Sequence, residues 1–216
     1  MFVLLFTLPL IGFSQNIYNE DDVKFNQDSS LVLLKSNDTP VSGIVKKTCK
    51  QKGMIFKIRT NCEYVIKNGL FISSKGYYKN NQISQETQRN GICKFYYKNG
   101  VIKYTGNMVE GWYDGVWKYF DKKGVLETEE IWEDGELITE KDYEKNGSLW
   151  REMEWTSDNS GIFKLYDGGL GLVIKEGTLK NGKKEGVWKY YTVNYEDGTK
   201  KLDKKIIFKN GKKVRK

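Results

Sequence analysis

A six-residue phrase recurs four times in this chain, and it constrains the fold more than any other feature. Each copy begins with Gly followed by Ile or Val, has Lys at its fourth position, and ends on Tyr or Phe. The copies start at Gly91, Gly115, Gly161 and Gly186, and the middle interval is nearly twice as long as each of the other two. An interval close to two periods predicts a decayed copy between the second and the third. A fixed period in this range is typical of repeat architectures rather than of a single domain built around a catalytic centre.

Turn signals separate the copies. Of 22 glycines, 10 follow Asn or Asp, and these dipeptides favour hairpin turns in which both central residues have positive φ. We therefore expect successive hairpins, with turns at the following pairs: Asn68-Gly69, Asn90-Gly91, Asn99-Gly100, Asp114-Gly115, Asp134-Gly135, Asn146-Gly147, Asp167-Gly168, Asn181-Gly182, Asp197-Gly198 and Asn210-Gly211.

Side chains in the phrase alternate between two faces, as they do along a strand. One face is predicted to be a packed aromatic surface made of Phe95, Trp117, Tyr119, Phe163, Trp188 and Tyr190, with Cys93 in the position of the tryptophans. The other face repeats a lysine and an aromatic residue: Lys94, Tyr96, Lys118, Phe120, Lys164, Tyr166, Lys189 and Tyr191. The prediction is an all-β fold, an elongated antiparallel meander of β-hairpins with about 24 residues in each repeat.

The first 14 residues have the apolar character and length of a secretory signal peptide. Small residues at Gly12 and Ser14 place cleavage between Ser14 and Gln15, and the absence of Cys at this boundary argues against a lipoprotein anchor. We expect a secreted or periplasmic protein with no transmembrane span in the mature chain. A buried first strand is the alternative, since no Lys or Arg follows Met1.

After the leader, residues 15–38 form a polar lead-in segment with one expected strand at 31–34, and residues 39–216 form the repeat array. An entry loop is expected at 37–40. The lysine-rich end from Lys209 to Lys216 is expected to close the array as a charged cap against edge pairing.

Composition narrows the chemistry. The chain has no histidine, which removes Ser-His, Cys-His and His-metal sites. Its three cysteines lack CxxC spacing, and Cys49 and Cys62 are the pair that could close a disulfide. No metal or cofactor is expected. Charge occurs in blocks: residues 16–105 carry 15 Lys/Arg and 7 Asp/Glu, 106–160 carry 6 and 15, and 180–216 carry 13 and 4.

The segment from Asp114 to Leu126, followed by Glu133-Asp134-Gly135-Glu136-Leu137, resembles the bacterial MORN-repeat variant family, often labelled YwqK-like antitoxins. Pro40-Val41-Ser42-Gly43 is similar to the opening phrase of that family. The resemblance extends over residues 38–214 and implies an array of β-hairpins that binds proteins or membranes. An antitoxin acts in the cytoplasm, which conflicts with export.

A second resemblance is to choline-binding repeats of cell-wall proteins, carried by Gly111-Trp112-Tyr113-Asp114-Gly115 and the phrase that follows. In those repeats aromatic side chains hold quaternary ammonium groups. Their period is shorter than the one here.

Three functional hypotheses follow. The first is a non-catalytic module that binds a protein partner or an anionic envelope surface through the repeated lysine and aromatic face. The second is a cell-wall or carbohydrate-binding protein that uses exposed aromatic residues on a polysaccharide. The third, an enzyme, would need a carboxylate pair within the acidic cluster Glu127, Glu129, Glu130, Glu133 and Asp134. Export argues against nucleic acid as a partner.

Overall fold

The computed structural model describes residues 16–26, 31–52, 57–156 and 159–214. The predicted signal peptide and its cleavage site after Ser14 lie outside these residues. The chain divides into two compact units, residues 1–74 and 75–216, which are described separately below.

The first unit is built from short and long strands. It contains β1 (Ile17–Asn19), the 3₁₀ turn η1 (Glu20–Asp22), β2 (Val23–Phe25), β3 (Val32–Leu34), β4 (Gly43–Lys52), β5 (Lys57–Lys67) and most of β6 (Leu70–Tyr77). β1 pairs in parallel with β4, and β4 pairs antiparallel with β5. β2 and β3 form a separate two-stranded antiparallel sheet.

The lead-in segment contributes to a small hydrophobic core. Val32, Val41, Val45 and Ile66 are buried together, and partly buried side chains pack against them: Tyr18, Val23, Leu34, Tyr64 and Phe71. The strand expected at 31–34 is present as β3, but the prediction of a single strand in this segment was wrong, because β1 and β2 also form. Each is very short, too short to show an alternating pattern in the sequence.

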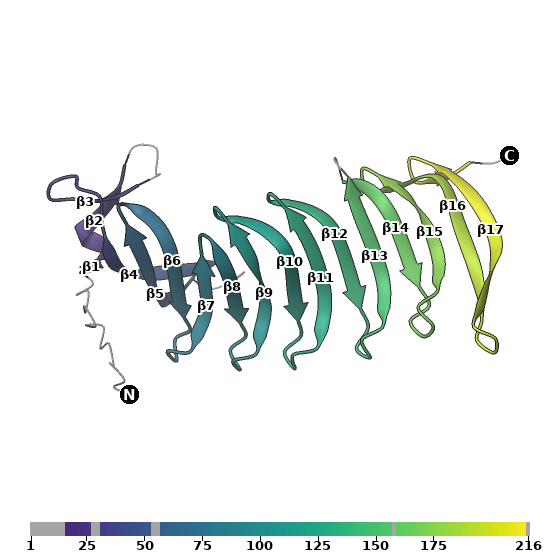
Figure 1. The fold of residues 1–216 in the computed structure, drawn as a ribbon, viewed down its shortest axis with the longest axis horizontal. Helices are drawn as coiled ribbons and strands as arrows, with labels where there is room; N and C mark the ends of the chain where they lie inside the picture. Colours follow the sequence, from purple (N-terminus) through teal and green to yellow (C-terminus); the bar gives the residue numbers. More distant parts are fainter. Residues whose placement is uncertain (1–15, 27–30, 53–56, 157–158, 215–216) are drawn as a thin grey trace, which may run out of the picture. The chain divides into compact units, whose positions relative to one another are not determined.

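The second unit is a meander in which every strand pairs antiparallel with the next, from β7 to β18. Figure 1 shows these hairpins side by side. The all-β repeated-hairpin prediction is therefore confirmed. The strands are β7 (Ile83–Gln88), β8 (Gly91–Tyr96), β9 (Ile102–Val109), β10 (Trp112–Phe120), β11 (Leu126–Glu133), β12 (Glu136–Tyr143), β13 (Leu149–Thr156), β14 (Ser160–Tyr166), β15 (Val173–Lys180), β16 (Lys183–Asn194), β17 (Thr199–Lys209) and β18 (Lys212–Lys213).

The register of the strands identifies the decayed copy of the phrase. β8, β10, β14 and β16 carry the four recognisable copies, and β12 occupies the intermediate place in the strand order. Its residues Ile138-Thr139-Glu140-Lys141-Asp142-Tyr143 align with the phrase, because Lys141 and Lys118 both lie opposite Glu129. A start at Ile138 divides the long interval between Gly115 and Gly161 into two equal parts. This copy keeps Lys and the final Tyr but has carboxylates in the two aromatic positions.

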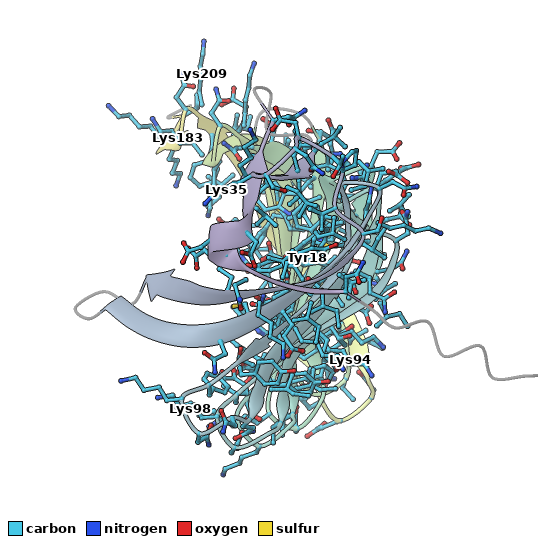
Figure 2. The ribbon with its side chains drawn as sticks, turned by 90° about the vertical axis from the view of Figure 1, so that its left-hand side faces the viewer. Tyr18, Lys35, Lys94, Lys98, Lys183 and Lys209 are labelled. Atoms are coloured by element: carbon cyan, nitrogen blue, oxygen red, sulfur yellow. The ribbon has the colours of Figure 1, made fainter. Side chains whose placement is uncertain are left out.

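Two kinds of turn connect the strands. At Asn68-Gly69, Asp134-Gly135, Asn181-Gly182 and Asn210-Gly211 both residues have positive φ, as predicted for two-residue hairpins. The turns at the other ends of the strands are longer: Gly100 donates its N–H to the Tyr97 carbonyl, and only the glycine has positive φ. Figure 2 shows Lys98, in one such longer turn, at one edge of the sheet, and Lys183 and Lys209, beside the two-residue turns, at the opposite edge.

Asp114-Gly115 is not a hairpin turn, contrary to the prediction. It lies inside β10, where the register with β9 shifts between Asp114 and Lys118. The hairpin turn of β9 and β10 is Glu110-Gly111 instead, with both residues at positive φ. Glycine with positive φ occurs both in β-bulges and in hairpin turns. The Asp-Gly dipeptide alone therefore does not distinguish a bulge from a turn.

Two glycines make room for the two buried tryptophans. A Cβ atom on Gly106 of β9 would lie 2.1 Å from the Trp117 ring, and one on Gly177 of β15 would lie 2.4 Å from the Trp188 ring. Both indole N–H groups donate to the carbonyl that follows the glycine, Asn107 at 2.9 Å and Thr178 at 3.1 Å. The ring therefore lies flat on the neighbouring strand. This explains how a single sheet can bury a tryptophan almost completely.

Candidate functional site

One face of the second unit carries a row of alternating charges, and we call it the ladder face. Cross-strand register places one side chain from each strand in the row, and like charges directly opposite one another are avoided except at its C-terminal end. From β7 to β17 the row contains Glu86, Lys94, Thr105, Lys118, Glu129, Lys141, Glu152, Lys164, Glu176, Lys189 and Lys205.

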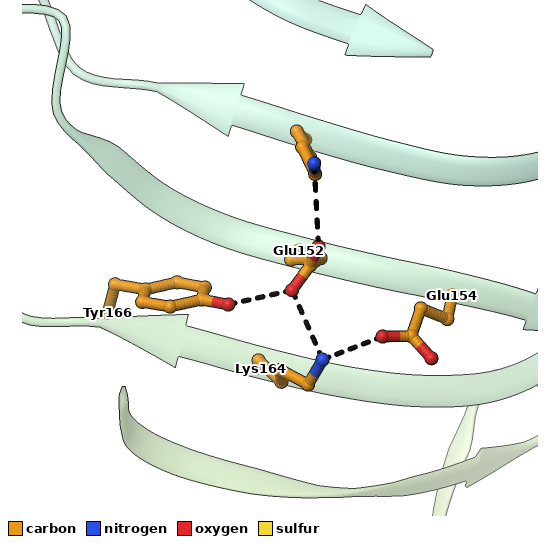
Figure 3. Close-up of polar contacts among 5 residues, drawn as sticks. Glu152, Glu154, Lys164 and Tyr166 are labelled. Carbon is orange, nitrogen blue, oxygen red and sulfur yellow. Dashed lines mark hydrogen bonds and ion pairs between the residues drawn. The ribbon is translucent and has the colours of Figure 1, made fainter. Parts of the chain in front are cut away.

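Four of the six lysines in the row pair with glutamates of adjacent strands. Lys118 lies 3.6 Å from Glu129, Lys189 lies 2.9 Å from Glu176, and Lys164 contacts both Glu152 at 3.2 Å and Glu154 at 2.6 Å. Figure 3 shows Lys164 between these two carboxylates. Glutamates therefore compensate most of the lysine charge of this row.

Tyrosine hydroxyls complete the network. In three copies the aromatic residue two positions after the lysine donates to the glutamate of the preceding strand: Tyr96 to Glu86 at 2.7 Å, Tyr166 to Glu152 at 2.7 Å and Tyr191 to Glu176 at 2.7 Å. The hydrogen bonds from Tyr191 and Lys189 lower the pKa of Glu176. Burial and the bond to Glu86 raise the pKa of Tyr96 to about 12.

The copy in β10 lacks both the donor and the acceptor of this hydrogen bond. Thr105 stands where the other three copies have glutamate, and Phe120 stands where they have tyrosine. A buried hydroxyl without an acceptor would be unfavourable, so the two changes are physically coupled. The network thus consists of repeated three-residue units, each with one glutamate, one lysine and one tyrosine.

A second row on the ladder face is apolar and exposed. It contains the second residue of each recognisable phrase, together with the residues that register places opposite two of them, Ile131 beside Val116 and Ile207 beside Val187. Their exposed fractions are 60 % for Ile92, 47 % for Val116, 36 % for Ile131, 45 % for Ile162, 49 % for Val187 and 45 % for Ile207. The row is interrupted by Asn107, Thr139, Glu154 and Thr178 on the strands between. It therefore presents short apolar patches, and exposed apolar patches on a protein surface mark interaction sites.

The opposite face, the aromatic face, is packed at its N-terminal end. Tyr113 stacks on the Trp117 ring with centroids 3.8 Å apart, and Tyr104 stacks on Phe95 at 4.2 Å and on Tyr119 at 5.5 Å. Trp117 is fully buried, as the alternating pattern predicts, and so are Trp188 and the free thiol of Cys93. Phe163 packs against Trp188 at 5.5 Å. These aromatic side chains pack against one another across neighbouring strands.

The aromatic face becomes polar where the decayed copy lies. Glu140 and Asp142 both accept hydrogen bonds from Arg151. Glu130 of β11 accepts from Tyr119 at 2.6 Å. Burial raises the pKa of Glu140, and the nearby Asp142 and Glu130 add to this effect against the attraction of Arg151. Within the described part of the chain, no group of three or more acidic or Cys side chains has the arrangement of a metal site.

The acidic cluster considered for an enzyme divides between the two faces. Glu129 lies on the ladder face beside Lys118, whereas Glu130 points to the aromatic face and accepts from the Trp132 indole at 2.8 Å. Glu129 and Glu130 therefore do not form a carboxylate pair on one face.

Sequence reasoning located the lysines and the tyrosines of the ladder face but missed three features. These are the glutamates that pair with the lysines, the exposed aliphatic row, and the residues of the decayed copy, Lys141 and Tyr143, whose existence but not position was predicted. The aliphatic row had a signal, since the second residue of every phrase is Ile or Val. The glycines under the tryptophans had one too, because Gly106 precedes Trp117 at the same spacing at which Gly177 precedes Trp188.

In the first unit Cys62 is disulfide-bonded. The side chain of Cys49, its expected partner, lies outside the described residues. Cys62 is buried in β5, where its backbone lies opposite Lys47 of β4.

Comparisons with known proteins give no relative for this chain. No family model matches it, and a search of curated proteins finds no match. Among the residues that the structure describes, none belongs to a helix with the length and apolar character needed to cross a bilayer.

Proposed function

We propose that this protein is an exported, non-catalytic repeat protein that binds a protein partner through the ladder face. The observation that carries this proposal is the aliphatic row, which leaves six β-branched side chains between 36 % and 60 % exposed beside a row of paired charges. Burying this row against a partner would remove apolar surface from water at about 25 cal/mol per Å². The resemblance to MORN-repeat variants agrees with a binding role.

The pairing of lysines with glutamates favours a protein over an anionic envelope surface. An anionic surface attracts unpaired positive charge, but Lys118, Lys164 and Lys189 already have carboxylate neighbours. A row of alternating charges can instead select a partner by register, since a shift of one strand would place like charges together.

Export is proposed from the leader and is supported by the disulfide bond of Cys62, since stable disulfides form in oxidising compartments. The label of antitoxin, with its cytoplasmic site of action, does not form part of the proposal.

The test compares two triple variants of the mature chain in quantitative co-purification from the native envelope. The first, Val116→Ser/Ile162→Ser/Val187→Ser, removes apolar surface from the ladder face. Its control, Lys98→Ser/Lys122→Ser/Lys145→Ser, changes exposed turn residues at one edge of the sheet. We expect the first variant to lose specific polypeptides that the control and the parent protein both retain.

Two further arms test the alternative partners. Sedimentation with vesicles of anionic phospholipid tests an envelope surface, and retention on immobilised cell-wall polysaccharide tests a carbohydrate. Equal recovery of all polypeptides by both triple variants, or binding to vesicles or polysaccharide alone, would contradict a protein partner on the ladder face.

A further inference from the structure

The two buried tryptophans of the aromatic face each lie against a glycine of the preceding strand, and two of the positions around them change from tyrosine to lysine between the copies. In the first copy Tyr104, two residues before the glycine, and Tyr113, four residues before Trp117, cover the indole ring. In the second copy the same two positions around Trp188 hold Lys175 and Lys184. In the first copy two aromatic rings cover the tryptophan at these positions, whereas the second copy has two charged side chains there.

Both ammonium groups lie over the rings of this copy. Lys184 Nζ is 4.4 Å from the centroid of the Trp188 ring and 4.7 Å from that of Phe208, and it donates to the Tyr190 hydroxyl at 3.0 Å. Lys175 Nζ is 5.5 Å from the Trp188 centroid and 5.6 Å from that of Phe163. Cation–π attraction of this kind contributes roughly 0.5–2 kcal/mol and holds the two charges close to each other.

These charges lack the partners that the ladder lysines have. Among the described residues, no salt bridge joins Lys175 or Lys184 to a carboxylate, and both side chains are partly buried. Burial lowers the pKa of Lys175, and the neighbouring charge of Lys184 lowers it further. A third lysine, Lys204, lies 5.7 Å from the Tyr190 ring, but it pairs with Asp203 at 3.0 Å. Two like charges held together without a counter-ion weaken the folded state unless an anion joins them.

We propose that Lys175, Lys184 and the hydroxyl of Tyr190 form a binding site for a dianionic tetrahedral oxyanion, a phosphate or a sulfate. The two ammonium groups supply two positive charges side by side, which match a dianion better than a single carboxylate. The Tyr190 hydroxyl accepts its hydrogen bond from Lys184, so its own hydrogen remains for an oxygen of the anion. The site lies on the aromatic face, and the proposal is independent of the partner proposed for the ladder face.

The test is isothermal titration of the mature protein with inorganic phosphate, inorganic sulfate and glucose 6-phosphate, at constant ionic strength. The main variant, Lys175→Tyr/Lys184→Tyr, installs the residues of the first copy. The control variant, Lys118→Gln/Lys189→Gln, removes the same charge from the ladder face. A second pair, Lys175→Arg/Lys184→Arg, keeps the charge, and the single variants Lys175→Gln and Lys184→Gln serve if the tyrosine pair does not fold.

We expect the parent protein, the arginine pair and the ladder-face control to bind, and the tyrosine pair and the glutamine variants to lose at least about tenfold in affinity, or about 1.4 kcal/mol. Glucose 6-phosphate binding more tightly than phosphate would assign the oxyanion to an ester of a larger molecule, and equal affinities would assign it to the free ion. Absence of binding to all three probes, or an equal loss in the ladder-face control, would overturn the proposal.

Discussion

Replacing Gly106 by alanine is expected to destabilise the second unit, although the same change in an unobstructed loop stabilises. The new Cβ would lie 2.1 Å from the Trp117 ring, whereas ordinary contact begins at 3.4 Å, so the ring must move away from β9. Trp117 has no free space to do so, because it is fully buried and stacked on Tyr113 at 3.8 Å.

The magnitude follows from two losses and one gain. Overpacking of a filled core costs about 1–3 kcal/mol, and displacement of the indole breaks its 2.9 Å hydrogen bond to the Asn107 carbonyl, worth about 0.5–1.5 kcal/mol. Alanine in place of glycine restores roughly 0.4–1 kcal/mol by restricting the unfolded chain. The net expectation is a decrease of about 0.5–4 kcal/mol in the free energy of unfolding, with a middle value of about 2 kcal/mol.

A double-mutant cycle isolates the contact. Urea unfolding followed by far-ultraviolet circular dichroism is measured for Gly106→Ala, Trp117→Ala and the double variant. In the Trp117→Ala background the alanine at 106 should be neutral or slightly stabilising, because the obstructing ring is absent. Gly169→Ala is the matched control, since a Cβ there meets its nearest atom at 3.5 Å. The same loss from Gly106→Ala in both backgrounds would refute the placement of the indole on Gly106.

Three shorter predictions follow from the same structure. Trp117→Ala should lower the free energy of unfolding by about 3–5 kcal/mol, whereas Lys118→Ala, whose ion pair is exposed, should change it by less than about 1 kcal/mol; equal effects in urea titrations would refute the face assignment. Hydrogen bonds from the Tyr191 hydroxyl and then Lys189 lower the pKa of Glu176 in the folded state. The carboxylate therefore stabilises the fold above its unfolded pKa, about 4.3, and this stabilisation is lost as pH falls through the folded pKa. In Glu176→Gln the free energy of unfolding should therefore depend less on pH between about pH 5 and pH 3. Mass spectrometry of the protein from its native compartment should show a chain that starts at Gln15, and a chain that retains Met1 would contradict export.

The repeat and its turn signals predicted the strands and the side of the sheet on which each phrase residue lies. The alternation of side chains along one strand depends only on the local sequence. It was sufficient to place Trp117 and Trp188 on the buried face. The pairing of Lys164 with Glu152 and Glu154 was beyond this reasoning, because it depends on the register between β13 and β14. A slip of one residue in that register would move every side chain to the other face.

The conformation of the turns also escaped local reasoning. Asn99-Gly100 and Asn181-Gly182 have the same kind of sequence, yet only the second has positive φ at both residues. The number of residues between the paired strands decides which turn forms, and that number depends on where the ladder of hydrogen bonds ends. The proposed oxyanion site could not be predicted from the alternation of side chains along a strand. It requires Lys175 and Lys184, from two adjacent strands, to lie over the Trp188 ring.

In the decayed copy in β12, the aromatic face and the ladder face have changed to different extents. The copy has lost both ring positions of the aromatic face, which hold Glu140 and Asp142 joined by Arg151. It keeps the lysine and the tyrosine of the ladder face, Lys141 and Tyr143, and Lys141 lies 3.8 Å from Glu152, but Thr139 replaces the aliphatic residue of the phrase. A polar network thus replaces ring packing in one hairpin while the lysine and the tyrosine of the ladder face are kept. Lys141 and Tyr143 therefore persist in a hairpin that has lost its ring packing, which agrees with the binding role proposed for the ladder face.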